Sequence, residues 1–166
     1  MTVIAWDGRY LVADRQAMHG DRRVEVTKFR IEVFDGVPTV AAWSGDLDGG
    51  YEMIDWYRRG AKREEWPALQ HNEDAWTRLI LCRRECWPIS YEKRPYPIAA
   101  DRDHDAWGSG RDFALGALRH GASAAEAVMI AIELCPSCGM GFDIVDTRTL
   151  EVRTVGIGYN QTGVSG

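Results

Sequence analysis

Thr2, near the start of the chain, combines two chemical groups that are suited to hydrolysis. If Met1 is removed, which the small Thr2 side chain permits, residue 2 carries both a hydroxyl nucleophile and a free α-amine. The unperturbed pKa of such an amine is about 7.7–8.0, so near neutral pH it can take the hydroxyl proton directly or through one water. The residue type at this position therefore indicates nucleophilic attack on a carbonyl group, provided that the amine is neutral.

The segment around Gly45 has features that would stabilise the charge produced by such an attack. A carbonyl oxygen becomes negative when it is attacked, and fixed backbone N–H groups stabilise that charge. Gly45 follows Ser44 in a sharp turn just before a predicted helix, whose N-terminus carries a partial positive charge. We therefore expect the N–H of Gly45 to face the attacked oxygen.

Length and composition predict one domain in the cytoplasm. The chain has 166 residues, 45% of them hydrophobic, which is enough to bury a core without disulfides or a metal. With 20 Lys and Arg against 25 Asp and Glu, its net charge of −5 argues against a nucleic-acid or membrane partner. The start of the chain lacks the pattern of a signal peptide, and no apolar run is long enough to span a bilayer. We expect one domain over residues 1–166, with a loose tail from about residue 160.

Turn signals divide the first part of the chain into two hairpins. Asp7-Gly8 and Asp35-Gly36 each separate two runs with strand-like composition. A polar loop is predicted between the hairpins over residues 18–23. The four predicted strands cover residues 2–6, 9–13, 28–34 and 37–43.

Apolar residues at helical spacing begin after Gly45. They predict one pair of helices over residues 46–59 and 74–86, and Pro88 ends the second of these. Another pair is predicted over residues 111–120 and 123–134. The last helix opens with Ser123 and Glu126 in a capping-box pattern. Further strands are predicted over residues 89–91, 97–100, 142–146 and 150–159.

The order of these elements predicts the α+β class. Hairpins come first, and pairs of helices then alternate with groups of strands, unlike the regular alternation of a βαβ protein. Two antiparallel sheets packed face to face, each covered on its outside by a helix pair, would bury every apolar face that this order creates.

Five local features follow one another along the chain. They are the strand that begins at Thr2, the segment Ala13-Asp14-Arg15-Gln16-Ala17, Lys28 at the start of the third strand, Trp43-Ser44-Gly45 and Gly108-Ser109-Gly110. Together they resemble the proteasome β-subunit family and its HslV-like members, and the resemblance covers the order of elements over nearly the whole chain. It implies the four-layer αββα sandwich of the N-terminal nucleophile (Ntn) hydrolases, and a threonine peptidase that hydrolyses peptide bonds.

The same resemblance implies roles for three side chains around Thr2. Lys28 would lie beside the terminal amine and lower its pKa by like-charge repulsion. Asp14 would keep that lysine charged and oriented. Ser109 resembles the serine that lies beside the terminal amine in this family.

The segment Cys135-Pro136-Ser137-Cys138-Gly139 departs from the family pattern. Many proteasome-type subunits have Asp-x-x-Ser-Gly here, which supports the amine. Cys138 would stand in place of the serine hydroxyl as a weaker hydrogen-bonding group, and no carboxylate replaces the missing Asp. A second hypothesis is therefore a subunit that has lost catalysis and acts as a structural ring or binding protein. A retained Met1 would also abolish catalysis.

The cysteines support a third hypothesis. Cys135 and Cys138 form a CxxC pair, and Cys82 and Cys86 are spaced to share a helix face, so a zinc site or a redox dithiol is formally possible. We favour buried, unligated thiols, and we expect neither a metal nor another cofactor.

The resemblance also implies partners. Members of this family form homo-oligomeric rings or stacked rings with the active sites inside. HslV-like members work with a hexameric ATPase that unfolds substrates, so peptides or unfolded proteins are the expected substrates, and an ATPase unfoldase is an expected partner.

Overall fold

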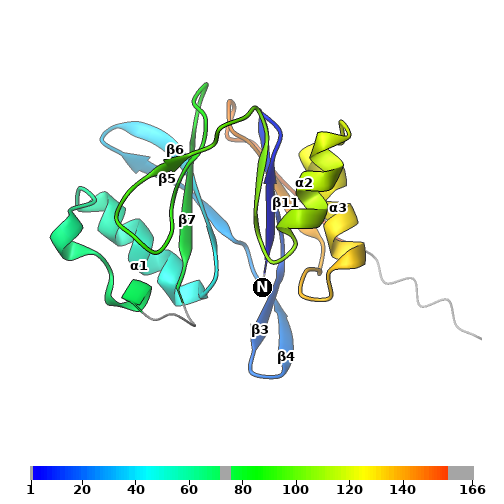
Figure 1. Cartoon of the computed structure of the whole chain (residues 1–166), viewed down its shortest axis with the longest axis horizontal. Coiled ribbons are helices and arrows are strands. Elements are labelled where there is room, and N and C mark those ends of the chain that lie inside the picture. The colour runs from blue at the N-terminus through cyan, green and yellow to red at the C-terminus, as the bar shows by residue number, and fades with distance from the viewer. Residues whose placement is uncertain (1, 72–75, 157–166) are drawn as a thin grey trace, which may run out of the picture.

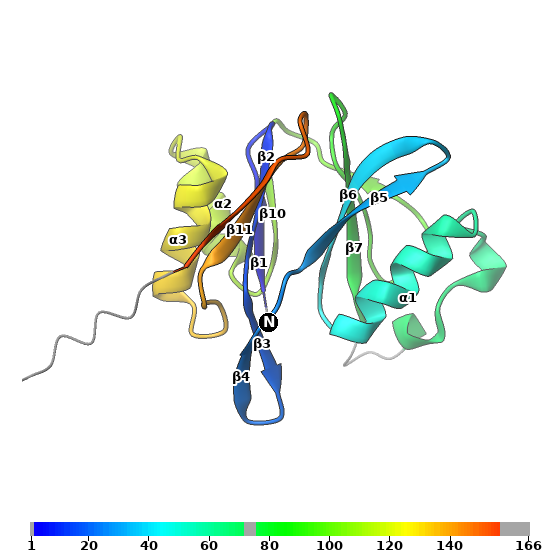
Figure 2. The same cartoon turned by 180° about the vertical axis from the view of Figure 1, so that it is seen from behind.

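Two sheets and three helices form four layers in the computed structural model of the chain, which describes residues 2–71 and 76–156 (Figure 1). The two antiparallel sheets pack face to face. One is covered on its outside by α1 (Leu47–Arg58), and the other by α2 (Arg111–Arg119) and α3 (Ala124–Leu134), as Figure 2 shows from behind. The predicted α+β class and αββα sandwich are confirmed.

The first sheet contains the N-terminal strand. Within the described residues, its strands lie in the order β10-β1-β2-β11-β12, and all neighbouring strands are antiparallel. Val3 pairs with Gly108, so Thr2 lies beside the turn that follows Gly108. The strands are β1 (Val3–Trp6), β2 (Tyr10–Asp14), β10 (Asp105–Gly108), β11 (Phe142–Asp146) and β12 (Val152–Val155).

Every residue of β1 is buried because both faces of this sheet are covered. Val3 and Ala5 belong to the core beneath α2 and α3, whereas Ile4 and Trp6 belong to the core between the two sheets. A strand buried on both faces has a continuous apolar sequence, as this one does. The start of the chain is thus fixed deep in the fold.

The second sheet lies in the order β5-β6-β7-β8-β9, again with antiparallel neighbours. A separate two-stranded ribbon, β3 with β4, follows β2 in the sequence. The strands of the second sheet are β5 (Phe29–Phe34), β6 (Val37–Ser44), β7 (Arg78–Arg83), β8 (Ile89–Tyr91) and β9 (Ile98–Ala99), and those of the ribbon are β3 (Gln16–His19) and β4 (Arg22–Glu25).

The predicted helix over residues 74–86 is wrong, because its described part contains strand β7 instead. Leu79 and Leu81 pack towards α1, while Ile80 and Cys82 face the other sheet. A short apolar run that is buried on both faces fits helical spacing as well as a central strand. Within the described residues, α1 is therefore followed by the short 3₁₀ turns η1 (Arg63–Glu65) and η2 (Ala68–His71) and not by a second covering α-helix.

Two other segments differ from the sequence prediction. The predicted polar loop over residues 18–23 is the tip of the β3–β4 hairpin, in which mostly polar and exposed strands give no alternating pattern. Strand β10 is not among the predicted strands, because it is short and begins with an acidic residue.

The two N-terminal hairpins and the other helices are confirmed. Asp46 caps α1 by accepting hydrogen bonds from the N–H groups of Asp48 and Gly49, and the predicted capping box of Ser123 and Glu126 is present at α3. None of the described helices has the length and apolar character needed to cross a membrane. Residues 74–75 of the predicted helix, residues 157–159 of the last predicted strand and the predicted tail lie outside the described residues.

Candidate active site

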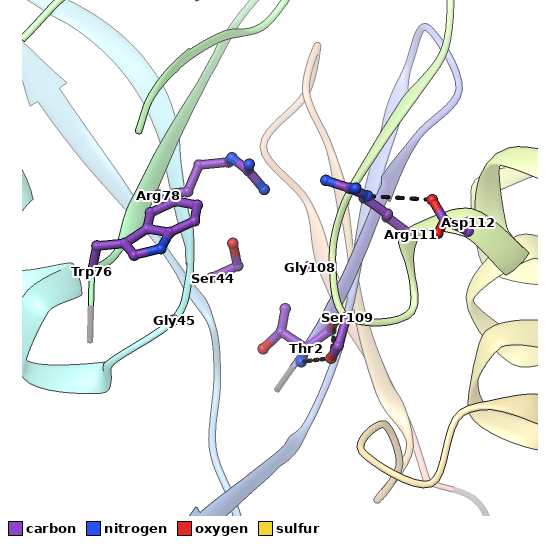
Figure 3. A pocket seen from close by; sticks show the side chains of 9 residues that line it. All are labelled: Thr2, Ser44, Gly45, Trp76, Arg78, Gly108, Ser109, Arg111 and Asp112. Atoms are coloured by element: carbon purple, nitrogen blue, oxygen red, sulfur yellow. Dashed lines mark hydrogen bonds and ion pairs between the residues drawn. The ribbon is translucent and has the colours of Figure 1, made fainter. Parts of the chain in front are cut away.

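A cleft of about 430 Å³ opens between the two sheets, beside the beginning of β1 (Figure 3). Thr2, Gly45 and Ser109, three of the predicted site residues, line it together. One wall consists of Ser44, Gly45, Trp76 and Arg78, and the other of Thr2, Gly108, Ser109, Arg111 and Asp112.

The turn before α2 holds Thr2 at both ends of its backbone. The nitrogen of Thr2 donates a hydrogen bond to Ser109 Oγ at 2.9 Å, and Ser109 Oγ donates one to the Thr2 carbonyl at 3.2 Å. The N–H of Gly110 donates to the same carbonyl at 3.1 Å. The atom that becomes the α-amine when Thr2 is the first residue is therefore positioned by a hydroxyl group.

Gly108 allows this close approach. Its φ of +94° lies in the left-handed region, and a Cβ at this position would lie 2.2 Å from the Thr2 carbonyl oxygen. A side chain here would force Thr2 to move. The glycine is therefore required for the geometry of the Thr2 backbone.

Asp14 and Lys28 form a buried ion pair next to this turn. Lys28 Nζ lies 2.7 Å from Asp14 Oδ1, and the exposed fractions of the two side chains are 4% and 0%. Asp14 Oδ1 also accepts the N–H of Val3 at 2.9 Å, so the lysine ammonium and the amide after Thr2 share one oxygen. The other carboxylate oxygen accepts the N–H groups of Gln16 at 3.3 Å and Gly139 at 3.0 Å.

Burial lowers the pKa of Lys28 below its ordinary value, although the charge of Asp14 and its hydrogen bond act in the opposite direction. The sequence-based expectation assigned a charged lysine to this position. The ion pair with Asp14 favours that charged form, whereas burial makes the ammonium group less basic than that of a surface lysine.

Cys138 lies in the same buried region. A Cβ on Gly110, in the turn that holds Thr2, would lie 3.0 Å from Cys138 Sγ. Burial first, and then the charge of Asp14, raises the pKa of Cys138 to about 12. The group at this position is therefore a neutral thiol near physiological pH, and it supplies no negative charge to its surroundings.

Gly45 borders the cleft directly before α1. Its φ is +115°, and a Cβ here would lie 2.5 Å from the backbone oxygen of Trp76. The backbone of Gly45 is thus packed against the segment that leads into β7. This packing and the cap formed by Asp46 fix the start of α1 at the edge of the cleft.

The four cysteines do not assemble into one site, and all are free thiols. Cys82 is buried between the sheets, Cys135 and Cys138 lie in the core beneath α2 and α3, and Cys86 is exposed. The helix face predicted for Cys82 and Cys86 is wrong, because this segment is a strand and a turn. Among the described residues, no group of three or more His, Cys, Asp and Glu side chains is arranged to hold a metal ion.

The sequence-based prediction missed the two arginines of the cleft. Arg78 opens the apolar run of β7, and Arg111 occupies the first turn of α2, where acidic residues are normally preferred. Both positions are unusual for an arginine, and that was the only signal in the sequence. It does not reveal that the two residues face one cleft, because strands β8, β9 and β10 separate them in the sequence.

The comparisons with known proteins show the same fold. The structure is similar to eukaryotic HslV from Trypanosoma brucei, with 20% identity and a TM-score of 0.62, over 93% of this chain and 99% of that one. It is similar to Anbu from Hyphomicrobium sp. strain MC1, with 17% identity and a TM-score of 0.67, over 96% and 88% of the two chains. For Anbu, an ancestral beta-subunit, from Yersinia bercovieri, the identity is 12% and the TM-score 0.69, over 95% and 88%.

No protein-family model and no curated protein sequence matches the chain. The structural similarity nevertheless extends over nearly the whole length of both partners in each comparison. The chain therefore has the fold of the Ntn hydrolases of the proteasome type. Both HslV and Anbu share this fold with the chain.

Proposed function

We propose that this protein is a threonine peptidase that hydrolyses peptide bonds with Thr2 after removal of Met1. The observation that carries the proposal is the hydrogen bond of 2.9 Å between the Thr2 nitrogen and Ser109 Oγ, in the wall of a cleft. The buried ion pair of Asp14 and Lys28 supports it, because Asp14 accepts a hydrogen bond from the amide of Val3, the residue after Thr2. The HslV-like fold supports the class of reaction.

In the proposed reaction, Thr2 Oγ1 attacks the carbonyl carbon of the peptide bond while its proton passes to the α-amine, directly or through one water. The tetrahedral intermediate collapses to an ester on Thr2, and the amine returns the proton to the departing nitrogen. A water, deprotonated by the same amine, then hydrolyses the ester and restores the Thr2 hydroxyl.

The surrounding groups would keep the amine neutral and oriented. Lys28 donates to the same Asp14 oxygen that accepts the amide of Val3, the residue after Thr2. The positive charge of Lys28 would therefore lower the pKa of the Thr2 amine. Ser109 Oγ would fix the position of the amine. The N–H of Gly45, at the other wall of the cleft, would donate to the oxyanion.

Cys138 favours a second candidate function, a proteasome-fold subunit without catalysis that serves as a structural ring or binding protein. Its neutral thiol and the absence of a carboxylate in residues 135–139 remove the support that the family pattern supplies at this position. This candidate requires no free amine at residue 2. It therefore predicts a retained Met1.

The proposal extends to assembly and location. We propose a homo-oligomeric ring or stacked rings in the cytoplasm, which would restrict access to Thr2, and an ATPase unfoldase that delivers unfolded chains. The similarity in fold to HslV and Anbu supports the ring. Sedimentation should show a discrete oligomer, whereas a monomer at working concentration would contradict this part of the proposal.

The test uses protein whose intact mass shows Thr2 as the first residue. An electrophilic threonine-protease probe should label the wild-type protein and the Thr2→Ser variant at residue 2, and should not label Thr2→Ala. Thr149→Ala, which removes an exposed hydroxyl in the turn between β11 and β12, should react like the wild type.

If protein with a verified Thr2 terminus is neither labelled nor able to cleave peptides, the peptidase proposal is wrong. A retained Met1, together with normal assembly of the Thr2→Ala variant, would instead support the structural subunit. Intact mass distinguishes these outcomes before any activity is measured.

A further inference from the structure

Two arginine side chains face each other across the cleft beside Thr2 (Figure 3). Arg78 begins β7 in the second sheet, and Arg111 begins α2 on the opposite wall. Their guanidinium groups point towards one another above Thr2 and Ser44. Because like charges repel, this arrangement is unfavourable unless an anion or solvent lies between the two groups.

Arg78 is held rigidly. Its Nε and one terminal nitrogen contact Glu92 Oε1 at 2.8 and 2.7 Å, and its guanidinium lies 5.2 Å from the centre of the Trp76 ring. The exposed fraction of the side chain is 8%. A guanidinium has five N–H donors, so two contacts with Glu92 leave donors for a second acceptor. A fixed and largely desolvated arginine is a favourable site for a carboxylate.

Arg111 is more exposed and more weakly held. Its Nε lies 3.3 Å from Asp112 Oδ1, and both side chains are largely open to solvent. Such a surface pair contributes little, so the arginine can reorient towards a ligand. In Figure 3, Asp112 lies on the side of Arg111 that faces away from Arg78, outside the gap between the two guanidinium groups.

The beginning of α2 adds to the positive potential. Its N-cap is Gly110, which offers no side-chain acceptor to the N–H groups of the first turn. These groups carry the partial positive charge of the helix N-terminus and lie in the wall that holds Arg111. The arginine pair and the helix end therefore attract the same sign of charge.

A second cavity, of about 350 Å³, continues beyond the arginines and shares Arg78, Arg111 and Asp112 with the first. Glu92 and Asp105 also line it. The two guanidinium groups attract an anionic group into the cleft beside Thr2. The carboxylates of Glu92 and Asp105 repel it from the second cavity. The charges thus define a position for a single acidic group close to Thr2.

We infer that Arg78 and Arg111 form a subsite that binds a carboxylate of the substrate beside Thr2. The preferred ligand is a peptide with either an acidic side chain or a free C-terminal carboxylate near the bond that is cleaved. Planar carboxylates match the paired donors of guanidinium groups. The inference rests on the proposed function for the reaction, but binding can be measured without catalysis.

The experiment uses the full-length Thr2→Ala protein and three short labelled peptides in an anisotropy titration. The first contains Glu and has an amidated C-terminus, the second has Gln in place of Glu and is amidated, and the third contains Gln and has a free C-terminus. At low salt we expect the first or the third to bind about tenfold more tightly than the second. The tighter of the two identifies the source of the carboxylate.

The Arg111→Met variant should remove most of this preference, whereas Arg119→Met, at the exposed end of the same helix, should retain it. The role of Arg78, in the opposite wall of the cleft, is tested with the double variant Arg78→Met/Glu92→Gln. The second substitution is needed because loss of Arg78 alone would leave the Glu92 carboxylate without its ion-pair partner. Equal binding of the three peptides would overturn the inference, as would equal losses in Arg111→Met and Arg119→Met.

These outcomes are separate from those of the peptidase test. A preference for acidic peptides in Thr2→Ala, combined with an unreactive wild-type protein, would support the subsite and contradict the peptidase. Cleavage by Thr2 without any preference for acidic peptides would support the peptidase and contradict the subsite.

Discussion

Lys28 Nζ lies 2.7 Å from Asp14 Oδ1, and both side chains are almost completely buried. The same carboxylate accepts the N–H groups of Val3, Gln16 and Gly139. One side chain therefore connects the start of β1, the start of β3, the residue before β5 and the segment after α3. Its charge is compensated only when all four segments are in place.

The first prediction concerns this ion pair. Asp14→Asn and Lys28→Met should each lower the free energy of unfolding by about 3–5 kcal/mol, because each leaves an uncompensated buried charge or unpaired donors. The double variant should lose less than the sum of the two. Urea unfolding measures the free energy of unfolding of the two single variants and the double variant. The control is Arg58→Met, which breaks ion pairs at the surface and should cost less than about 1 kcal/mol. Additive losses in the double variant would show that the two charges do not depend on each other.

The second prediction compares two glycines with nearly the same backbone conformation. Gly108 and Gly121 have φ values of +94° and +91°, but only at Gly108 would a Cβ meet another described atom within 4 Å. Gly121→Ala should cost about 1–2 kcal/mol from backbone strain alone. Gly108→Ala should cost about 2–5 kcal/mol because it also displaces Thr2. Urea unfolding and probe labelling should both separate the variants, and equal behaviour would contradict the role of Gly108.

The third prediction concerns thiol reactivity. Cys86 is exposed, whereas the other three thiols are buried, and burial raises the pKa of Cys82 and of Cys138, the latter to about 12. Iodoacetamide at about pH 8 should therefore modify Cys86 rapidly and the others only after unfolding. Peptide mass mapping identifies the modified residue, and Cys86→Ser should abolish the fast phase. Rapid modification of a second cysteine in the folded protein would contradict the buried placement.

The fourth prediction concerns acid. The hydrogen bonds from Arg9 lower the pKa of Asp146 from 3.8 to about 2, because they stabilise the carboxylate in the folded state. This contribution to stability is complete above the ordinary pKa and is lost as the pH falls through the lowered one, so the free energy of unfolding should decrease between pH 3.8 and about 2. Asp146→Asn should show a smaller decrease in acid titrations of unfolding, whereas Asp101→Asn should match the wild type. An unchanged decrease in Asp146→Asn would contradict this assignment.

The sequence predicted those parts of the fold in which local signals and burial agree. Asp7-Gly8 and Asp35-Gly36 marked true hairpins, and Ser123 with Glu126 marked the true start of α3. The run around Leu79 could not be assigned correctly, because a strand that is covered on both faces loses the alternation that distinguishes it from a helix. That error replaced a central strand by a helix and gave the second sheet a pair of covering helices.

The candidate site was predictable only in part, for a physical reason. Thr2 was identified by its place after Met1, and Gly45 and Ser109 by turn signals. The structure brings the three residues to one cleft. Asp14 and Lys28 also lie together, as the resemblance implied. The arginines on the two walls come from segments that meet only when the sheets pack, so neither spacing nor periodicity relates Arg78 to Arg111.

The contact between Gly139 and Asp14 has a consequence for the newly made chain. Asp14 emerges early from the ribosome, whereas the amide of Gly139 and the final strands that hold it follow much later. A partly synthesised chain therefore contains Thr2 but cannot yet complete the surroundings of the carboxylate that binds the next amide. Under the proposed function, Thr2 would therefore become competent for catalysis only after most of the polypeptide has been made and folded.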